Sequence, residues 1–391
     1  MTTMRYAVRA LALSLSLTAA GALCVVGAAA PAHATASDPV GGQQLAAPGV
    51  IVNLEPGVPP PPAMPGASFL LADLDTGQIL VARAPHSRHL PASTLKTLTA
   101  LTLIPLLDAN AKIMVRPEDV RVEGSHLGIL PGTAYRVDTL LQGMLMASGN
   151  DAAYALARGN HSMAVTLKAM NATAADLNAF DTVAKDPSGL DKAGQTSSAY
   201  DLALIARTAM KLPDFRQYVI KKQTSVPGGR SADGKLKPDF KITSHNKLLY
   251  NYQGAIGIKS GYTIAARQTY IGAATRGGKT YLVTQMYSPN GSWRPHAALL
   301  DWAFAHGESV TPIGELVKPG KATPPKPSAQ TGGRPQPPPG TSLGDSTLLA
   351  ALPAWVGIGS LISGLALVGT WRRRHILRKR SSRKRSSRKR S

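Results

Sequence analysis

Residues 269–286 read TYIGAATRGGKTYLVTQM, in which two apolar runs rich in β-branched and aromatic residues flank Arg276-Gly277-Gly278. This pattern is typical of a β-hairpin. A second hairpin pattern, residues 68–82, surrounds Asp75-Thr76-Gly77 near the other end of the same region. The two hairpins therefore predict a sheet built from strands near both ends of a single domain.

The residues between the two hairpins have the apolar spacing of helices. Helices are expected at 93–107, 137–146, 151–158, 165–177 and 198–211, with a further helix at 293–306, and residues 254–263 are expected to form a strand. Strands around a helical centre predict an α+β fold in which helices cover an antiparallel sheet.

Composition divides the chain into six parts. The 391 residues are 43% hydrophobic, which excludes a fully disordered chain and supplies the core of one large domain. The parts are a signal peptide at 1–34, a Pro-rich lead-in at 35–66, the folded domain at 67–317, a Pro-rich stalk at 318–345, a transmembrane helix at 346–371 and a basic tail at 372–391.

Both ends of the chain carry membrane-targeting patterns. Arg5 and Arg9 precede a charge-free apolar run that ends in Ala32-His33-Ala34, which is typical of a cleaved secretory signal; an uncleaved anchor is the alternative. The apolar segment before Arg372 is long enough to cross a bilayer, and the 12 Lys and Arg residues from there onward predict a cytoplasmic tail near anionic lipid. We expect a single-pass cell-membrane protein whose folded domain is extracellular.

Several function classes are not expected. The net charge of +22 is concentrated in the tail, where lipid headgroups are nearer partners than nucleic acid, so no nucleic-acid binding is expected. The single cysteine, Cys24, lies in the signal peptide, which leaves the mature chain without a disulfide or a Cys nucleophile. The nine histidines show no paired metal-ligand spacing, so neither a metal nor a cofactor is expected.

The first motif that could carry out catalysis joins Ser93 and Lys96. Their spacing of three residues, at the start of an expected helix, places them on one helical face. Ser93 would lie at the helix N-terminus, where free N–H groups favour a developing negative charge. A serine nucleophile needs a base, and a lysine can serve only if desolvation or a second cation keeps it neutral.

Two further motifs follow in the same region. Ser148-Gly149-Asn150 lies between two expected helices and can direct a hydroxyl and a carboxamide into a cleft, and Lys259-Ser260-Gly261 lies on the strand expected at 254–263. Each pattern is weak alone, because Ser-x-x-Lys occurs four times in the chain. The ordered set, however, is found in penicillin-binding proteins and class A β-lactamases.

Further segments make the resemblance specific. Residues 148–153, 198–203, 246–249 and 257–263 are similar to those of the D-alanyl-D-alanine carboxypeptidases of the serine peptidase S11 type, the low-molecular-mass penicillin-binding proteins. The resemblance covers about residues 67–306. It implies a penicillin-binding/serine β-lactamase-like domain, with a helical subdomain beside the sheet. It also implies an enzyme of cell-wall biogenesis that removes the terminal D-alanine from peptidoglycan stem pentapeptides.

The resemblance assigns three catalytic residues. Ser93 would attack the carbonyl between the two terminal D-alanines, Lys96 would be the base for acylation, and Ser148 would relay a proton to the leaving D-alanine. β-Lactams, which imitate this end of the substrate, would be covalent inhibitors at the same serine.

The resemblance also assigns the substrate-binding residues. Asn150 would bind the peptide before the scissile bond, while Lys259 and Ser260 would bind the terminal carboxylate. The backbone N–H groups of Ser93 and Tyr262 would hold the oxyanion.

One segment departs from the family pattern, and three functions compete with the one implied. Asp186-Pro187-Ser188-Gly189-Leu190 stands where Asn-Pro-His-Gly-Leu is usual, which puts the bracing of this loop in question. A class A β-lactamase would need a Glu to activate water, but residues 151–258 contain nine Asp and no Glu. A peptidoglycan DD-endopeptidase and an inactive wall-binding membrane protein are the second and third competing functions.

Overall fold

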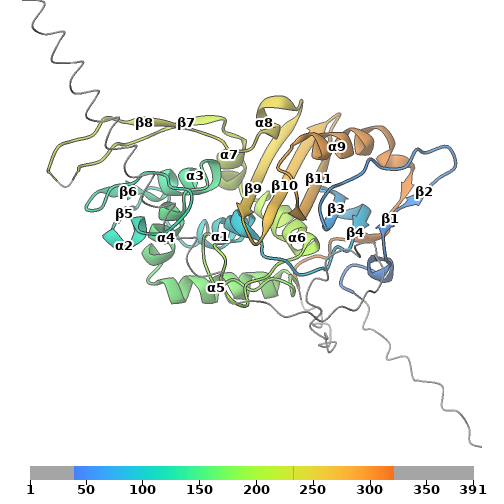
Figure 1. The fold of residues 1–391 in the computed structure, drawn as a ribbon, viewed down its shortest axis with the longest axis horizontal. Coiled ribbons are helices and arrows are strands. Elements are labelled where there is room, and N and C mark those ends of the chain that lie inside the picture. The colour runs from blue at the N-terminus through green and yellow to red at the C-terminus, as the bar shows by residue number, and fades with distance from the viewer. Residues whose placement is uncertain (1–38, 232, 321–391) are drawn as a thin grey trace, which may run out of the picture. The chain divides into compact units, whose positions relative to one another are not determined.

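The computed structural model describes residues 39–320 except residue 232, and an antiparallel sheet forms its centre (Figure 1). The strands of this sheet are β1 (Val50–Ile51), β3 (Ser68–Asp73), β4 (Gln78–Arg83), β9 (Ala255–Thr263), β10 (Arg267–Arg276), β11 (Lys279–Ser288) and β13 (Gly314–Glu315). They pair in the order β1-β4-β3-β11-β10-β9, and β13 also pairs with β4. Strand β9 therefore lies at one edge of the sheet.

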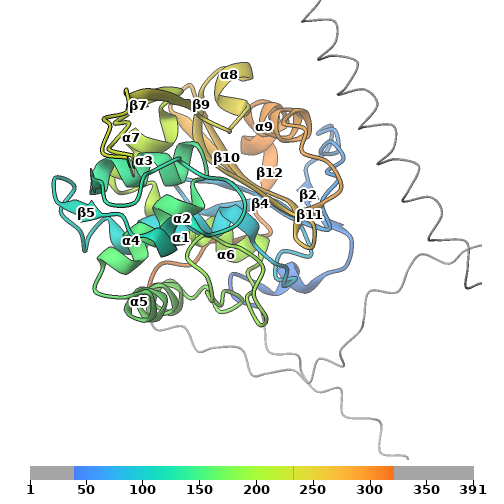
Figure 2. The same cartoon turned by 60° about the vertical axis from the view of Figure 1, so that its left-hand side comes forward.

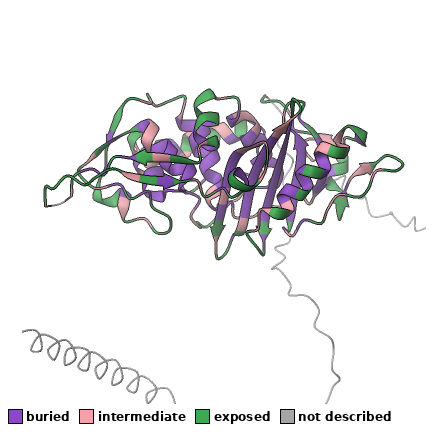
Figure 3. Cartoon of the chain, turned by 90° about the horizontal axis from the view of Figure 1, so that it is seen from above, coloured by how far each residue is buried: buried purple, intermediate pink, exposed green. Residues whose placement is uncertain are grey.

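Both predicted hairpins are confirmed, and β3 of the first pairs with β11 of the second. Every residue of β3 is buried, because helices cover both faces of the sheet (Figure 3). Leu70 and Ala72 belong to the core shared with the large group of helices, whereas Phe69 and Leu71 belong to a second core beneath α9 (Arg294–His306). The predicted α+β arrangement is thus present.

The helices other than α9 gather mainly on one side of the sheet, except α8, whose Leu248 belongs to the core beneath α9 (Figure 2). They are α1 (Lys96–Leu103), α2 (Pro117–Val120), α3 (Val137–Met146), α4 (Asn150–Gly159), α5 (Met163–Asp176), α6 (Ala199–Ala209), α7 (Pro213–Ile220) and α8 (Leu248–Asn251), with 3-10 turns η1 (Gln43–Ala46), η2 (Ala92–Leu95) and η3 (Gly307–Ser309). Ser162 and Ser198 cap α5 and α6 by accepting hydrogen bonds from backbone N–H groups of the first turn.

The sequence located the long elements better than the short ones. All six predicted helices are present, although the segment at 93–107 is divided into η2 and α1, and the strand predicted at 254–263 is β9. Helix α7, the short helices α2 and α8 and three small strand pairs were not predicted. These pairs are β2 (Asn53–Leu54) with β12 (Val310–Thr311), β5 (Lys112–Met114) with β6 (Ala134–Arg136), and β7 (Gln223–Val226) with β8 (Phe240–Thr243).

The described part of the Pro-rich lead-in packs on the domain. Strand β1 pairs with β4, and the indole N–H of Trp302 donates to the carbonyl of Pro59 at 2.8 Å. These contacts extend the folded unit to the N-terminal side of residue 67, because the open edge of β4 offers backbone partners to the preceding chain.

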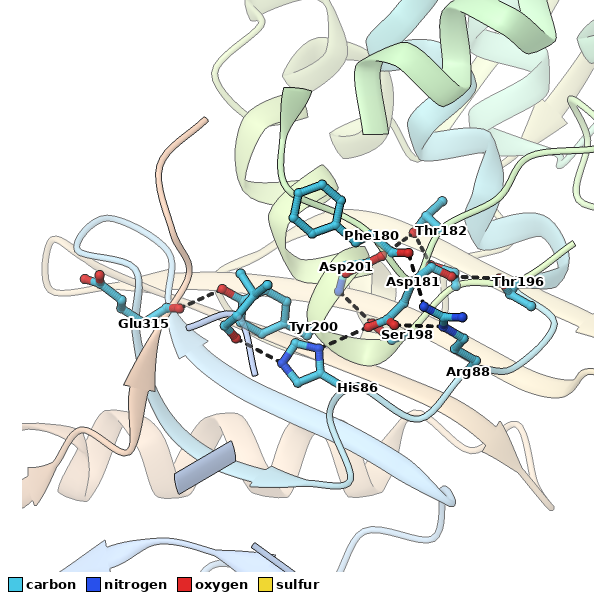
Figure 4. A network of polar contacts seen from close by, with 12 residues as sticks. His86, Arg88, Phe180, Asp181, Thr182, Thr196, Ser198, Tyr200, Asp201 and Glu315 are labelled. Carbon is cyan, nitrogen blue, oxygen red and sulfur yellow. Dashed lines mark hydrogen bonds and ion pairs between the residues drawn. The ribbon is translucent and has the colours of Figure 1, made fainter. Parts of the chain in front are cut away.

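A polar network ties both ends of the described chain to the domain (Figure 4). The His86 ring lies 3.0 Å from an oxygen of Asp181 through one nitrogen and 3.0 Å from the carbonyl of Val40 through the other. The Tyr200 hydroxyl donates to the carbonyl of Glu315 at 2.9 Å. The rings of His86 and Tyr200 are themselves in contact, so the segments before β1 and after β12 are bound by two neighbouring side chains.

The predicted signal peptide, transmembrane helix and basic tail lie outside the described residues, as does nearly all of the predicted stalk. Within residues 39–320, leaving out 232, none of the helices combines the length and the apolar character needed to cross a bilayer.

Candidate active site

Ser93 and Lys96 meet where η2 passes into α1. Ser93 is half-buried, and Lys96, the first residue of α1, has no exposed surface. The Nζ atom of Lys96 lies 2.8 Å from the Oγ atom of Ser93. The spacing of three residues thus gives the predicted contact between a hydroxyl and an amine.

The Lys96 amine has three oxygen neighbours that dictate its orientation. Besides Ser93, it lies 2.7 Å from Asn150 Oδ1 and 2.7 Å from the carbonyl oxygen of Ser188. A neutral amine has two N–H groups and one lone pair. If the N–H groups donate to these two carbonyl oxygens, the lone pair is left facing the Ser93 hydroxyl. The geometry therefore suits removal of the serine proton.

Burial and charge both act on the Lys96 amine. Burial, together with the positive charge of Lys259, holds the pKa of Lys96 well below its usual value, while the carboxylates of Asp186 and Asp151 act in the opposite direction. The lowered pKa favours the neutral amine that a general base requires.

Lys259 approaches from β9, on the other side of the site. Its side chain is 2% exposed, and Nζ donates to Ser148 Oγ at 3.1 Å and to the carbonyl of Ser260 at 2.7 Å. Burial lowers the pKa of Lys259 to about 7. Ser148, between α3 and α4, has a positive φ of 60°, and its hydroxyl oxygen accepts from this amine. The second and third motifs are therefore in contact.

Two glycines allow the backbone to close around η2. A Cβ atom on Gly261 of β9 would lie 2.7 Å from the backbone nitrogen of Ser93. A Cβ atom on Gly189 would lie 1.9 Å from the carbonyl oxygen of Ala92, and this residue has a φ of +85°. Strand β9 and the 186–190 loop thus reach the Ser93 backbone from two sides only because both positions lack a side chain.

The structure separates Ser260 and Tyr262 from Lys259. Successive residues of a strand face opposite sides of the sheet, and Ser260 is opposite Tyr270, which packs beneath α9. Ser260 lines a cavity of about 430 Å³ on that side. The Tyr262 side chain is 56% exposed. Only the backbone of Tyr262 therefore lies next to Gly261, where β9 comes close to Ser93.

Asn150 and the 186–190 loop have roles that the motifs alone did not indicate. The side-chain oxygen of Asn150 accepts a hydrogen bond from Lys96, and its amide N–H donates to the carbonyl of Glu123 at 2.6 Å. Both ends of the side chain are therefore engaged within the protein. Sequence reasoning missed Ser188 as a neighbour of Lys96. The only signal was the departure of the 186–190 segment from the family pattern.

Comparison with known proteins identifies the class. The family described as Peptidase_S11, D-alanyl-D-alanine carboxypeptidase, matches residues 57–287. The chain therefore belongs to this family of serine D-Ala-D-Ala carboxypeptidases, homologues of the low-molecular-mass penicillin-binding proteins.

Individual relatives agree with this assignment. D-alanyl-D-alanine carboxypeptidase DacB2 of Mycobacterium tuberculosis is 38% identical over 264 residues, which are 66% of this chain and 88% of DacB2. The D-alanyl-D-alanine carboxypeptidase of Streptomyces sp. strain K15 is 31% identical over 245 residues, covering 59% of this chain and 84% of the relative.

Solved structures confirm the fold. A crystal structure of a D-alanyl-D-alanine carboxypeptidase from M. tuberculosis H37Rv superposes with a TM-score of 0.63 at 39% identity, covering 68% of this chain and 99% of the other. For the Streptomyces K15 DD-transpeptidase the TM-score is 0.60 at 27% identity, with 63% of this chain and all of the other covered. The fold is that of the penicillin-binding proteins, as the resemblance implied.

Proposed function

We propose that the protein removes the terminal D-alanine of peptidoglycan stem pentapeptides through an acyl-enzyme at Ser93. The single observation that carries this proposal is the 2.8 Å contact between Ser93 Oγ and the fully buried amine of Lys96. A binding protein would have no need to desolvate an amine beside a serine, because burial of an unpaired charge costs stability.

Acylation depends on the orientation of the Lys96 amine that the carbonyl oxygens of Asn150 and Ser188 set. Ser93 Oγ attacks the carbonyl carbon between the two D-alanines while Lys96 Nζ takes the hydroxyl proton, so that an oxygen–carbon bond forms and the carbonyl oxygen becomes an oxyanion. The backbone N–H groups of Ser93 and Tyr262 would stabilise that oxyanion. Lys259 attracts the terminal carboxylate, whereas the Ser260 side chain faces the other side of β9 and contacts Lys259 only through its backbone carbonyl.

Departure of D-alanine requires a proton on its nitrogen. The Lys96 ammonium gives up the proton it took from Ser93, and Ser148, which is hydrogen-bonded to Lys259, would relay that proton to the leaving nitrogen as the carbon–nitrogen bond breaks. Water then attacks the Ser93 ester while the neutral Lys96 accepts its proton, and Lys96 returns that proton to Ser93 Oγ as the oxygen–carbon bond breaks and the shortened peptide is released. A penicillin would acylate Ser93 by the same first step and remain attached.

The setting of the reaction is part of the proposal. The signal pattern at 1–34 and the apolar segment at 346–371 support a single-pass protein of the cell membrane, with the described domain outside the cell, where its peptidoglycan substrate lies. The basic tail would adjoin anionic lipid on the cytoplasmic side.

Mass spectrometry tests the acyl-enzyme directly. The full chain in detergent is incubated with penicillin and, separately, with a peptide that ends in D-Ala-D-Ala, alongside a Ser93→Ala variant. The expected result is a penicillin adduct on the peptide that contains Ser93, and free D-alanine from the second incubation, with neither product from Ser93→Ala. An adduct that persists in the variant would assign the nucleophile to another residue.

A further inference from the structure

Asp186 is a buried acid beside the active site, with 2% of its surface exposed. One carboxylate oxygen accepts hydrogen bonds from the backbone nitrogen of Ser188 at 2.8 Å, from the Ser188 hydroxyl at 2.5 Å and from the backbone nitrogen of Leu190 at 3.3 Å. The other oxygen accepts from the hydroxyl of Tyr154 on α4. Because all four partners donate, the surroundings suit an ionised carboxylate.

These hydrogen bonds fix the orientation of the loop that faces Lys96. Two of the four donors belong to Ser188, and the carbonyl of that same residue lies 2.7 Å from Lys96 Nζ. The next carbonyl back along the chain, that of Pro187, accepts from the Thr99 hydroxyl of α1 at 2.6 Å. The loop is thus joined to α1 on one side and to Asp186 on the other, which leaves the Ser188 carbonyl little freedom to turn away.

The charges around Lys96 come from three elements. Among the described residues, Lys259 of β9 is the one cation that acts on it, while Asp151 of α4 and Asp186 are the anions; Ser93 and Asn150 complete the contacts and are neutral. The Asp151 carboxylate is already engaged by the backbone nitrogens of Leu127 and Gly128. Of the two acids, Asp186 raises the pKa of Lys96 more.

We propose that Asp186 is a positioning residue for acylation: its carboxylate braces the Ser188 carbonyl against Lys96, and its negative charge stabilises the ammonium that forms when Lys96 takes the proton of Ser93. When the Ser93 oxygen–carbon bond forms, the serine proton moves to Lys96 Nζ, and the new positive charge is opposed by Lys259 and favoured by Asp186. A carboxylate offsets the repulsion from Lys259 at that moment, whereas an amide could brace the loop but not offset the charge. The inference rests on the proposed function, because it takes Lys96 as the base.

Three variants distinguish the effect of the Asp186 charge from that of the hydrogen bonds by which Asp186 positions the Ser188 carbonyl. Asp186→Asn keeps an oxygen for Ser188 but removes the charge, and Asn is the residue usual at this position in the family pattern. Tyr154→Phe keeps the charge and removes one hydrogen bond. Asp201→Asn is the matched control, because Asp201 is also a buried aspartate, 1% exposed, but its carboxylate accepts from Thr182 and is not among the groups that act on Lys96.

The experiment measures the second-order rate constant for acylation by a fluorescent penicillin as a function of pH, with the full chain in detergent. Acylation needs neutral Lys96, so its rate falls on the acid side as the amine becomes protonated. Loss of the Asp186 charge makes the amine easier to deprotonate, so in Asp186→Asn this acid limb moves to lower pH by about one unit. The rate above the limb falls about tenfold or more, because the ammonium is less stabilised.

The remaining variants give different profiles if the inference is correct. Tyr154→Phe lowers the rate at every pH by a factor of about two to ten and leaves the acid limb in place. Asp201→Asn leaves the limb in place as well. Thermal unfolding by circular dichroism verifies that each variant is folded. If Asp186→Asn does not fold, Ser188→Ala removes one donor to the carboxylate, and the brace predicts slower acylation with an unmoved limb.

Two outcomes would overturn the inference. If the acid limb of Asp186→Asn coincides with that of the wild type, the Asp186 charge does not act on Lys96. If Tyr154→Phe and Ser188→Ala both acylate at the wild-type rate, the hydrogen bonds of Asp186 do not position the Ser188 carbonyl. Absence of acylation in the wild type at every pH would instead contradict the proposed function, so the two failures are distinguishable.

Discussion

Lys259 Nζ lies 3.1 Å from Ser148 Oγ, although 111 residues separate the two in the sequence. This contact joins the edge of the sheet to the loop between α3 and α4, and it places a second amine within the electrostatic reach of Lys96. The positive charge of Lys259 thereby lowers the pKa of Lys96 and favours its neutral form. In the proposed mechanism the two amines have separate roles: Lys96 takes a proton and Lys259 holds a carboxylate.

Replacement of Lys96 by Ala tests the base. Acylation by penicillin is expected to slow by about 10²–10⁴-fold, the usual contribution of a general base. The fold should persist at reduced stability, because the substitution removes a buried amine together with three buried methylene groups. Stopped-flow acylation and thermal unfolding measure the two effects. A variant that keeps the wild-type rate would exclude Lys96 as the base.

The charge on Lys259 predicts an alkaline decline in activity. With its pKa lowered to about 7 by burial, Lys259 loses its proton as the pH rises through that value and no longer attracts the terminal carboxylate. We expect kcat/KM for a D-Ala-D-Ala peptide, which reports the free enzyme, to fall above about pH 7. The control is a peptide whose terminal carboxylate is amidated. Equal alkaline declines for both peptides would argue against a role for Lys259 in carboxylate binding.

Gly189→Ala should disturb the nucleophile more than an equally unfavourable backbone change elsewhere. Its Cβ atom would overlap the carbonyl oxygen of Ala92, beside Ser93. Gly194 is the matched control, because its φ of +75° is similar but no atom lies within 4 Å of an added Cβ. We expect Gly194→Ala to cost about 1 kcal/mol of stability and to acylate normally. Gly189→Ala should be less stable and acylate at least about tenfold more slowly, since small displacements of a nucleophile are costly.

The network in Figure 4 predicts an acid-dependent loss of stability. Burial alone would raise the pKa of Asp181, but hydrogen bonds from His86 and Arg88 outweigh it and hold the pKa below its usual value. A lowered carboxyl pKa stabilises the fold above the unfolded-state pKa of about 4, and this contribution is lost as the pH falls through the folded-state value. We expect Asp181→Asn to lose about 1–2 kcal/mol at neutral pH.

Thermal unfolding of Asp181→Asn and wild type at several pH values measures this effect. The difference in Tm should narrow as the pH falls below about 4, because the wild-type carboxylate then becomes protonated as well. Arg136→Ala is a suitable control, since its ion pair with Asp138 is exposed and contributes little. A Tm difference that stays constant across this range would show that the Asp181 charge does not stabilise the fold.

The comparison of sequence with structure shows where local pattern is sufficient. The contact of Ser93 with Lys96 was predictable, because a spacing of three residues at a helix start leaves few geometries. Strand β3 and its hairpin partner β4 were predictable because turn residues and β-rich runs are adjacent in the sequence. The short pair β7 and β8 was not, since a two-stranded element has little burial to shape its pattern.

Local sequence by itself determined the long elements and the order of the three motifs, since helical spacing and hairpin turns depend only on neighbouring residues. The class of chemistry followed from the resemblance of the ordered motifs to a known family. Tertiary structure decided which groups surround the Lys96 amine. The carbonyl of Ser188 and the carboxylate of Asp186 belong to a loop about 90 residues away in the chain, and a backbone carbonyl leaves no trace in residue identity. Only the packing of that loop against α1 and η2 brings the Ser188 carbonyl to Lys96 and Asp186 within its electrostatic reach, and burial there lowers the affinity of Lys96 for a proton.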